Sequence, residues 1–243
     1  MKIKNDTVWA VISARSGSVS IPHKNIYKIN KRPMLAYSIM AAQKSKLINR
    51  VIVSTDSKKY MSISKSFGAE VPFLRPKSIS KNNSQDIDFF KHLINWFRVN
   101  EKFIPEYLLH MRPTTPIRNP KIIDKAIKEF IGSDFSALRS VQKMSSTAYK
   151  TFEVENSKLK NILNKSYDIE KSNLPRQIFK DTYEANGYVD IVRTSMIDKG
   201  IIHGKKVKAF VTNSTPDIDS IDDLKYLEFI VKSKPELLNS LFK

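Results

Sequence analysis

The chain contains no cysteine, and this absence excludes several classes of protein. Disulfide scaffolds, cysteine-based zinc or iron–sulfur sites and thiol catalysis all require that residue. No apolar run approaches the roughly 20 residues that a membrane helix needs. The apolar stretch at residues 8–14 contains Ser13 and is followed directly by Arg15, so it does not have the form of a signal peptide. We therefore expect a cytoplasmic protein with no membrane partner.

Acidic residues are also scarce, because 24 Asp and Glu stand against 42 Lys and Arg, for a formal net charge of +18. Such an excess suits nucleic acid, anionic membranes or acidic small molecules. Lysine accounts for 32 of the basic residues and is spread along the whole chain, whereas phosphate and base-edge recognition favours arginine forks. No RNP1-like aromatic pattern, zinc finger or basic zipper is present. A lysine-rich surface without a nucleic-acid partner is favoured, and a polyanionic small substrate stays open.

The overall composition of the chain is that of a globular protein. The 243 residues are 41% apolar, 27% charged and 10% aromatic, which excludes a disordered or collagen-like chain. A chain of this size buries roughly 70–75% of its unfolded surface, enough for one substantial core. We expect a single domain over residues 1–243.

Short apolar runs alternate with helical patterns over the first 140 residues. Strands are expected at residues 7–13, 50–54, 70–73, 107–111 and 135–141. Helices are expected at residues 33–46, 58–67, 84–100 and 119–131, and again at 221–231 after a strand at 207–211. This alternation predicts an α/β fold with a mainly parallel sheet covered by helices on both faces. Residues 145–206 break the rhythm and are interpreted as a small irregular excursion from the same domain.

The first expected strand is followed directly by residues 14–25, which read Ala-Arg-Ser-Gly-Ser-Val-Ser-Ile-Pro-His-Lys-Asn. Ligands of α/β sheets bind at this carboxyl edge. Small residues let backbone N–H groups approach an anion, while Arg15 and Lys24 supply positive charge, so the loop suits a nucleoside triphosphate. It is neither a P-loop nor a dinucleotide fingerprint. An ordinary serine-rich loop is the alternative.

This loop resembles the signature of the acylneuraminate cytidylyltransferases, the CMP-sialic acid synthetases. Residues 112–118 (Arg-Pro-Thr-Thr-Pro-Ile-Arg) resemble that family's Gln-Pro-Thr-Ser-Pro-Leu-Arg. Residues 186–191 (Asn-Gly-Tyr-Val-Asp-Ile) resemble its Asn-Gly-Ala-Ile-Tyr-Ile, and residues 217–220 its Asp-Ile-Asp-Thr. Residues 54–57 and 75–76 also match, so the resemblance spans residues 8 to about 224 in order.

The resemblance implies a Rossmann-like nucleotidyltransferase that moves CMP from CTP to an acidic nonulosonic sugar, with Mg²⁺ and release of pyrophosphate. It also implies a homodimer, with residues 145–206 serving dimerisation and sugar binding. The implied catalytic residues are Arg15, Lys24, Asp217 and Asp219. The implied nucleotide site is Ala14, Arg15, Ser16, Gly17, Ser18, Lys24, Asn25 and Arg75. Candidate sugar contacts are Arg112, Thr114, Thr115, Arg176, Gln177, Tyr183 and Asn186.

Two interpretations of residues 217–223, here called the acidic segment, stay open. In an extended segment, Asp217 and Asp219 point to one side and can share a magnesium ion. Alternatively, Ser220 and Asp223 form a capping box, and Asp219 only supports the start of a helix. Asp56 is a further candidate metal ligand with the same ambiguity, because an aspartate after a strand often caps a helix.

The chain departs from the family pattern at two places. Val19 and Ser20 replace the usual Lys-Gly, which removes one cation facing the phosphates. Arg112 replaces the usual Gln, and its planar fork favours an acceptor sugar whose facing groups accept hydrogen bonds. Alternatively, Arg112 pairs with a neighbouring carboxylate and never meets the sugar.

The four histidines are isolated in the sequence and receive no catalytic role. Two other functions remain as alternatives. One is a nucleotidyltransferase that uses another nucleotide or a sugar phosphate. The other is a non-catalytic basic module that binds nucleic acid.

Overall fold

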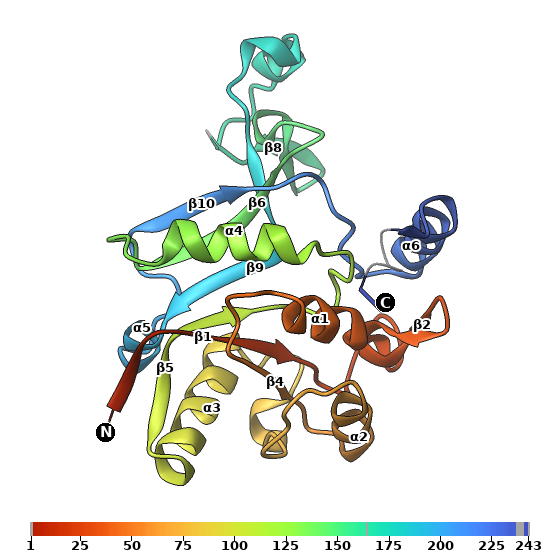
Figure 1. Cartoon of the computed structure of the whole chain (residues 1–243). Coiled ribbons are helices and arrows are strands. Elements are labelled where there is room, and N and C mark those ends of the chain that lie inside the picture. The colour runs from red at the N-terminus through yellow and green to blue at the C-terminus, as the bar shows by residue number, and fades with distance from the viewer. Residues whose placement is uncertain (1, 164, 237–240, 243) are drawn as a thin grey trace.

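A six-stranded sheet forms the centre of the computed structural model, which describes residues 2–163, 165–236 and 241–242 (Figure 1). In spatial order its strands are β10 (Val207–Val211), β6 (Ala137–Lys143), β9 (Tyr183–Arg193), β5 (Phe103–His110), β1 (Lys2–Ser13) and β4 (Arg50–Ser54). Strand β9 runs antiparallel to its neighbours β5 and β6, and the other pairs are parallel. The mainly parallel sheet expected from the sequence is confirmed, with one strand reversed.

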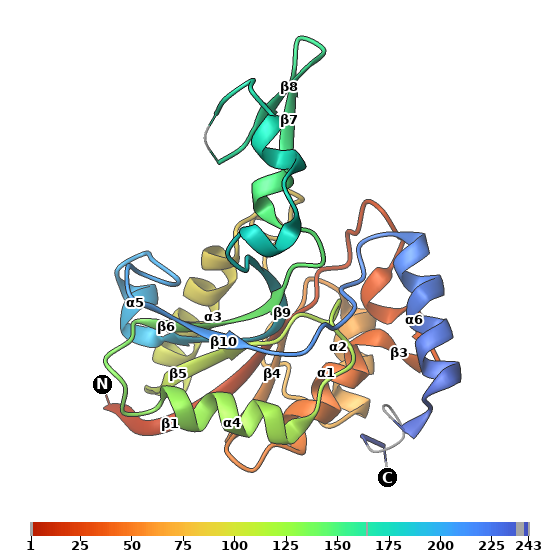
Figure 2. The same cartoon turned by 90° about the horizontal axis from the view of Figure 1, so that it is seen from above.

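Helices cover both faces of this sheet (Figure 2). They are α1 (Met34–Gln43), α2 (Lys58–Ser66), α3 (Asp86–Asn100), α4 (Pro120–Phe130), α5 (Thr194–Asp198) and α6 (Ile221–Ser233). Successive side chains of a strand point to opposite faces. Along β1, Val8, Ala10 and Ile12 therefore join one core with α1, α2, α4 and α6, whereas Trp9 and Val11 join a second core with α3 and α5.

Helix α4 illustrates how the local sequence sets these elements. Asn119 caps its first turn with a side-chain oxygen, an interaction that contributes about 1 kcal/mol. Pro120 occupies the first turn, where no backbone hydrogen bond is lost. Ile123, Ile127 and Phe130 recur at helical spacing and are fully buried. The helix expected at residues 119–131 is therefore confirmed to within one residue at each end.

The strand expected at residues 70–73 is wrong beyond its first residue. Glu70 forms a β-bridge to Ile52, and the chain then continues without regular structure. Pro72 has no N–H to donate to a ladder, so pairing ends before it.

Residues 144–163 and 165–182, here called the arm, connect the neighbouring strands β6 and β9. The arm projects from the sheet in both views and carries an antiparallel hairpin of β7 (Phe152–Glu155) and β8 (Lys158–Asn161). It is shorter than the irregular segment expected at residues 145–206, because β9 and α5 belong to the main fold. Strand β9 is buried on both faces from residue 186 to residue 192, which explains its apolar residues Tyr188, Val189, Ile191 and Val192; the charged residue among them, Asp190, is buried as well.

Candidate active site

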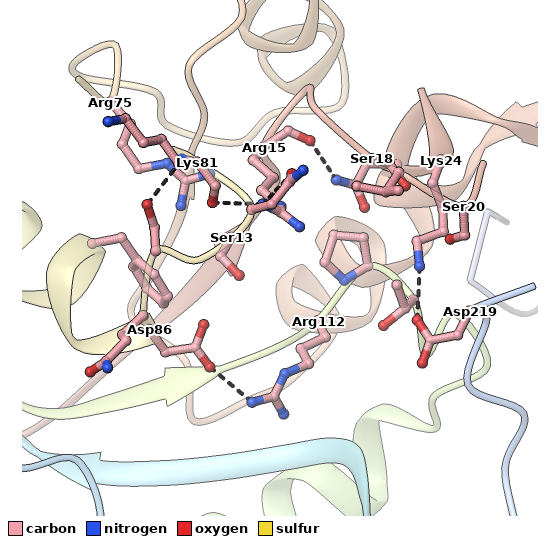
Figure 3. Close-up of a pocket in the computed structure, with 18 of the residues that line it drawn as sticks. Ser13, Arg15, Ser18, Ser20, Lys24, Arg75, Lys81, Asp86, Arg112 and Asp219 are labelled. Atoms are coloured by element: carbon pink, nitrogen blue, oxygen red, sulfur yellow. Dashed lines mark hydrogen bonds and ion pairs between the residues drawn. The ribbon is translucent and has the colours of Figure 1, made fainter. Parts of the chain in front are cut away.

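A cavity of about 570 Å³ lies at the carboxyl edge of the parallel strands (Figure 3). Its walls come from the loop after β1, the segment between α2 and α3, the first turn of α3, the loop after β5 and the segment between β10 and α6. The lining residues are Ser13, Arg15, Ser18, Val19, Ser20, Lys24, Asn25, Arg75, Ile79, Lys81, Asn82, Ser84, Gln85, Asp86, Phe89, Arg112, Pro113, Thr114, Asp217 and Asp219. This is the edge where open α/β sheets bind their ligands.

The fold brings together predicted residues that lie up to about 200 positions apart in the chain. Those that line the cavity are Arg15, Ser18, Lys24, Asn25, Arg75, Arg112, Thr114, Asp217 and Asp219. Cations from the loop after β1 thus share one cavity with carboxylates from the segment before α6.

The loop after β1 is held by its own polar contacts. The backbone N–H and hydroxyl of Ser16 donate to the Asp56 carboxylate at 2.8 and 2.9 Å. Asn25 Nδ2 donates to the Arg15 carbonyl at 2.9 Å, and the backbone N–H of Ala14 continues the ladder to Ser54. Asp56 is therefore an anchor for this loop and does not line the cavity, which places the candidate metal ligand behind the site.

Arg15 reaches across to the segment between α2 and α3. Its Nη1 donates to the Lys81 carbonyl at 2.6 Å and to Asn82 Oδ1 at 3.0 Å. Nearby, a β-carbon added at Gly17 would meet nothing within 4 Å, so neighbouring protein atoms do not require a glycine there. The loop leaves open space at the point where an anion is expected.

Lys24 connects this loop to the acidic segment. Its ammonium donates to Asp219 Oδ1 and to the Ile218 carbonyl, both at 2.8 Å. Ile218 is fully buried, and its N–H donates to the Thr114 carbonyl at 2.9 Å. The residues on either side of it, Asp217 and Asp219, line the cavity. The two carboxylates therefore lie on the same side of an extended segment, as alternation predicts.

The capping box is present as well. Ser220 accepts from the backbone N–H of Asp223, and the Asp223 carboxylate accepts from the N–H of Ser220 at 2.7 Å. The cap uses the side chains of Ser220 and Asp223 and leaves the carboxylates of Asp217 and Asp219 to the cavity. The capping box is therefore confirmed, and so is the placement of both carboxylates on one side of the segment, whereas their binding of magnesium stays a prediction.

The carboxylates of Asp217 and Asp219 suit a magnesium ion that also binds substrate phosphates better than a metal ion bound only by protein side chains. Within the described ranges, no group of three or more His, Cys, Asp or Glu side chains is arranged to hold a metal. Magnesium prefers hard oxygen ligands and commonly binds one or two carboxylates together with substrate phosphates. Asp217 and Asp219 fit that requirement.

Arg75 is the cavity's buried cation. Its side chain is only 6% exposed, and Nε and Nη2 have no hydrogen-bond partner among the described residues. Burial lowers the pKa of Arg75, although a guanidinium remains charged at neutral pH. Unsatisfied buried donors are costly unless a ligand completes them. Arg75 therefore lines the cavity with two buried donors that have no partner among the described residues.

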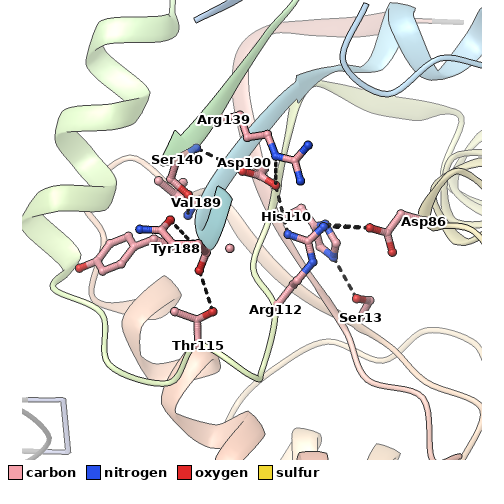
Figure 4. A network of polar contacts seen from close by, with 12 residues as sticks. Ser13, Asp86, His110, Arg112, Thr115, Arg139, Ser140, Tyr188, Val189 and Asp190 are labelled. Atoms are coloured by element: carbon pink, nitrogen blue, oxygen red, sulfur yellow. Dashed lines mark hydrogen bonds and ion pairs between the residues drawn. The ribbon is translucent and has the colours of Figure 1, made fainter. Parts of the chain in front are cut away.

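Arg112 is paired with two carboxylates at the cavity wall (Figure 4). Its Nη2 lies 3.0 Å from Asp86 Oδ2, and its Nη1 lies 3.2 Å from Asp190 Oδ2. Burial acts to lower the pKa of Arg112, but these two carboxylates outweigh it and raise the pKa. The carboxylate pairing weighed as an alternative from the sequence is thus present, and direct recognition of the sugar by this fork stays a prediction.

His110 is a site residue that the sequence did not reveal. It lies at the end of β5, is 4% exposed, and makes a 2.9 Å hydrogen bond through Nε2 to the hydroxyl of Ser13. Its Nδ1 is 3.9 Å from Asp86 Oδ2. Burial, followed by the charge of Arg112, lowers the pKa of His110 well below its usual value, so the ring is neutral. A lone histidine inside an apolar strand was the available signal.

Arg118 is a second residue whose role the sequence did not reveal. It is fully buried, and burial lowers its pKa to about 10. Its guanidinium donates to the carbonyls of Tyr188, Gly187, Thr115 and Arg112 and to the Ser38 hydroxyl. Arg118 therefore locks the loop after β5 onto β9.

Gly187 permits the same junction. Its φ of +63° favours glycine, and a β-carbon there would lie 3.1 Å from the Thr115 hydroxyl and 3.5 Å from Arg112. The backbone of β9 can approach the wall of the cavity only because this position has no side chain.

Several predicted sugar contacts lie outside the cavity. Thr115 and Asn186 are buried behind its wall, where the Thr115 hydroxyl donates to the Asn186 carbonyl at 3.1 Å. In the arm, Arg176 donates to the carbonyls of Ser145 and Met144. Gln177 belongs to the same short helix, and Tyr183 opens β9 next to it. These three residues do not line the cavity of their own chain.

Comparison with known proteins agrees with this geometry. A family model described as "Cytidylyltransferase" matches residues 9–232. The chain belongs to this cytidylyltransferase family. It is 30% identical to a CMP-N,N'-diacetyllegionaminic acid synthase of Campylobacter jejuni, over 93% of this chain and 96% of the relative. It is 28% identical to post-translational flagellin modification protein B of Campylobacter coli, over the same shares.

A solved structure shows the same fold. A CMP:2-keto-3-deoxy-manno-octonic acid synthetase complexed with CTP superimposes with a TM-score of 0.68 at 15% identity, covering 94% of this chain and 99% of that one. The Rossmann-like nucleotidyltransferase fold is confirmed. In the described part of this cytidylyltransferase, no helix is both long and apolar enough to cross a membrane.

Proposed function

We propose that this cytidylyltransferase transfers CMP from CTP to an acidic nonulosonic sugar in the cytoplasm. The observation that carries the proposal is the shared cavity, in which Arg15 and Lys24 face Asp217 and Asp219. A sugar hydroxyl oxygen attacks the α-phosphorus, the bond from that phosphorus to the bridging oxygen breaks, and pyrophosphate leaves. The hydroxyl proton passes to solvent. Such transfers depend mainly on positioning and charge stabilisation, which these residue types provide.

Asp217 and Asp219 would hold Mg²⁺, which neutralises phosphate charge when bound. Arg15 donates from the end of β1, where its guanidinium is held on neutral oxygens and carries no carboxylate partner in the described part of the chain. Lys24 lies between the loop after β1 and Asp219, so its ammonium reaches the space between the phosphates and the acidic segment.

Arg75 supports the choice of cytosine. Cytosine presents acceptors at O2 and N3, whereas uracil carries a proton at N3. The guanidinium of Arg75, a residue that lines the cavity, offers donors that suit these two acceptors, and a site built on such donors rejects a base that presents a proton instead. Asn25, which also lines the cavity, completes the base site with its side-chain oxygen.

The acidic acceptor is supported by charge and by the relative from C. jejuni, whose name gives an acidic sugar. Five basic side chains line the cavity against three acidic ones, Asp86, Asp217 and Asp219. This balance favours a sugar that carries a carboxylate in addition to the triphosphate.

The same proposal includes a homodimer formed through the arm. The arm exposes large apolar side chains, which isolated soluble surfaces rarely gather on one projection. They include Val154 (75% exposed), Leu163 (53%), Tyr167 (52%) and Ile178 (63%). Arg176, Gln177 and Tyr183 lie away from their own cavity, so a sugar contact by them requires a partner's cavity. Replacing Val154 and Ile178 together by Glu should give a monomer in light-scattering chromatography.

A pyrophosphate-release screen tests the activity. Each of the four nucleoside triphosphates is combined with acidic nonulosonic sugars and, as the matched alternative, with neutral sugar phosphates. We expect release only with CTP, Mg²⁺ and an acidic nonulosonic sugar, and none with the Asp217→Asn protein. Equal release with a second nucleotide, or release with a neutral sugar phosphate alone, would contradict the proposal.

A further inference from the structure

The basic side chains of the cavity differ in whether a carboxylate of the protein already pairs with them. Lys24 is paired with Asp219, and Arg112 is paired with Asp86 and Asp190. In contrast, the ammonium of Lys81 makes no hydrogen bond or ion pair with any residue of the described ranges, although Lys81 is one of the residues that line the cavity.

The backbone that carries Lys81 is fixed. Its carbonyl accepts from Arg15 Nη1 at 2.6 Å, and its N–H donates to the Ser84 hydroxyl at 2.9 Å (Figure 3). Lys81 is therefore attached to the arginine that faces the triphosphate, so its side chain starts from a defined place at the cavity wall. A lysine stem with four rotatable bonds can then bring its charge to an anion in the cavity.

The loop after β1 lacks a cation at Val19, an exposed position that borders the cavity. Val19 lines the cavity and is 75% exposed, yet its side chain offers neither charge nor a donor. Among residues 14–25 the permanent cations are Arg15 and Lys24, and Lys24 is shared with Asp219. A triphosphate bound here would therefore meet a gap in positive charge on the Val19 side.

We propose that Lys81 binds the triphosphate of the nucleotide and supplies, from the segment between α2 and α3, the positive charge that the loop after β1 lacks at Val19. This inference rests on the proposed function, because it takes CTP as the ligand. Lys81 contacts the β- and γ-phosphates, which carry the charge that leaves as pyrophosphate.

Nucleotide binding without an acceptor sugar tests the inference. Titration calorimetry with CTP and with CMP, both in Mg²⁺, compares the unaltered protein with Lys81→Ala and with the charge-neutral Lys81→Gln. Removal of one charge-assisted hydrogen bond should weaken CTP binding by roughly 10- to 100-fold. Binding of CMP, which lacks the β- and γ-phosphates, should change by less than about threefold. Lys77, an exposed lysine of the same segment that does not line the cavity, is the matched control, and Lys77→Ala should bind CTP normally.

A rescue variant separates charge from loop structure. Val19→Lys in the Lys81→Ala background places a lysine on the opposite wall of the same cavity and should restore most of the CTP affinity. If Lys81→Ala and Lys77→Ala bind CTP equally well, or if Lys81→Ala weakens CTP and CMP to the same extent, Lys81 does not bind the triphosphate. Failure of the unaltered protein to bind CTP would instead overturn the proposed function itself.

Discussion

Lys24 Nζ and Asp219 Oδ1 lie 2.8 Å apart, and their ion pair joins two segments separated by 195 positions in the sequence. The lysine side chain is only 12% exposed, whereas the aspartate is 79% exposed. An exposed partner contributes little to stability, because solvent screens the pair. The significance of the contact is therefore its position, since it holds the acidic segment against the loop after β1.

The first prediction separates the metal-binding carboxylates from the helix cap next to them. Asp217→Asn and Asp219→Asn should each reduce Mg²⁺-dependent turnover strongly, because a hard anionic ligand is lost, while the melting temperature changes little. Ser220→Ala is the matched control. It removes the cap acceptor and should lower the free energy of unfolding by about 1 kcal/mol with turnover retained at saturating Mg²⁺. The reverse pattern, with stable turnover in both Asn variants, would leave these aspartates without a metal role.

The second prediction concerns Arg75 and the choice of base. Arg75→Ala should raise the KM for CTP by about 10- to 100-fold, because two charged donors are removed from a buried site. The ratio of kcat/KM for CTP over UTP should fall in the same variant. Steady-state kinetics with both nucleotides measures this. A variant that binds CTP more weakly but keeps the CTP/UTP ratio would show that Arg75 only supports the wall of the cavity.

The third prediction tests the pairing of Arg112 with Asp190. Asp190 is 2% exposed, and in Arg112→Gln its nearest remaining cation is Arg139, at 4.0 Å. The free energy of unfolding should fall by about 2–3 kcal/mol, less than for a fully buried pair because the Arg112 side chain is 30% exposed. The double variant Arg112→Gln/Asp190→Asn should recover most of this loss in urea unfolding.

The same variants decide whether Arg112 reads the sugar. If Arg112 only holds the two carboxylates, the ratio of kcat/KM for two acidic sugars will be the same in the double variant as in the unaltered protein. A changed ratio in a variant of normal stability would establish the contact with the acceptor that the sequence predicts.

The fourth prediction follows from the lowered pKa of His110, which burial causes first and Arg112 second. In the unfolded chain a histidine takes up a proton near pH ~6.5, whereas the folded protein resists it. The unfolded state therefore binds more protons below that pH. The free energy of unfolding should fall as the pH drops below about 6.5, by up to about 1.4 kcal/mol per pH unit for this one proton. Urea unfolding of His110→Gln should show a slope that is smaller by that one proton, and an unchanged slope would contradict the assignment.

The sequence located three walls of the cavity, the loop after β1, the loop after β5 and the segment between β10 and α6, because each of them follows a strand. Arg15 and Arg112 come directly after short apolar runs, and Asp217 and Asp219 precede a recognisable helix cap. Position relative to a strand end is a local property, so it can be read without knowing how the strands pair. The same local reasoning predicted α1, α2, α3, α4 and α6, since their caps and apolar spacing lie within a few residues of each other, but it missed the short helix α5.

The polar network behind the cavity depends on strand pairing, so it could not be predicted from the sequence. His110 stands opposite Asp190 only because β9 runs antiparallel to β5, a register that the sequence does not display. Asp86 lies in the first turn of α3, where acidic residues are common, so nothing in the sequence marks it as part of the site. Its partners, Arg112 and His110, come from β5 and the loop that follows it. Charge compensation of this kind appears only when the sheet is assembled.

The parts of the site are also synthesised in a fixed order, because a ribosome makes a chain from its N-terminal side. The loop that we propose binds the triphosphate is complete by residue 25, whereas both proposed magnesium ligands follow residue 216. Almost the whole sheet must therefore exist, including the reversed strand β9, before the carboxylates can reach Lys24. A partly synthesised chain has the cations without their carboxylates, so the complete cavity requires synthesis beyond residue 219.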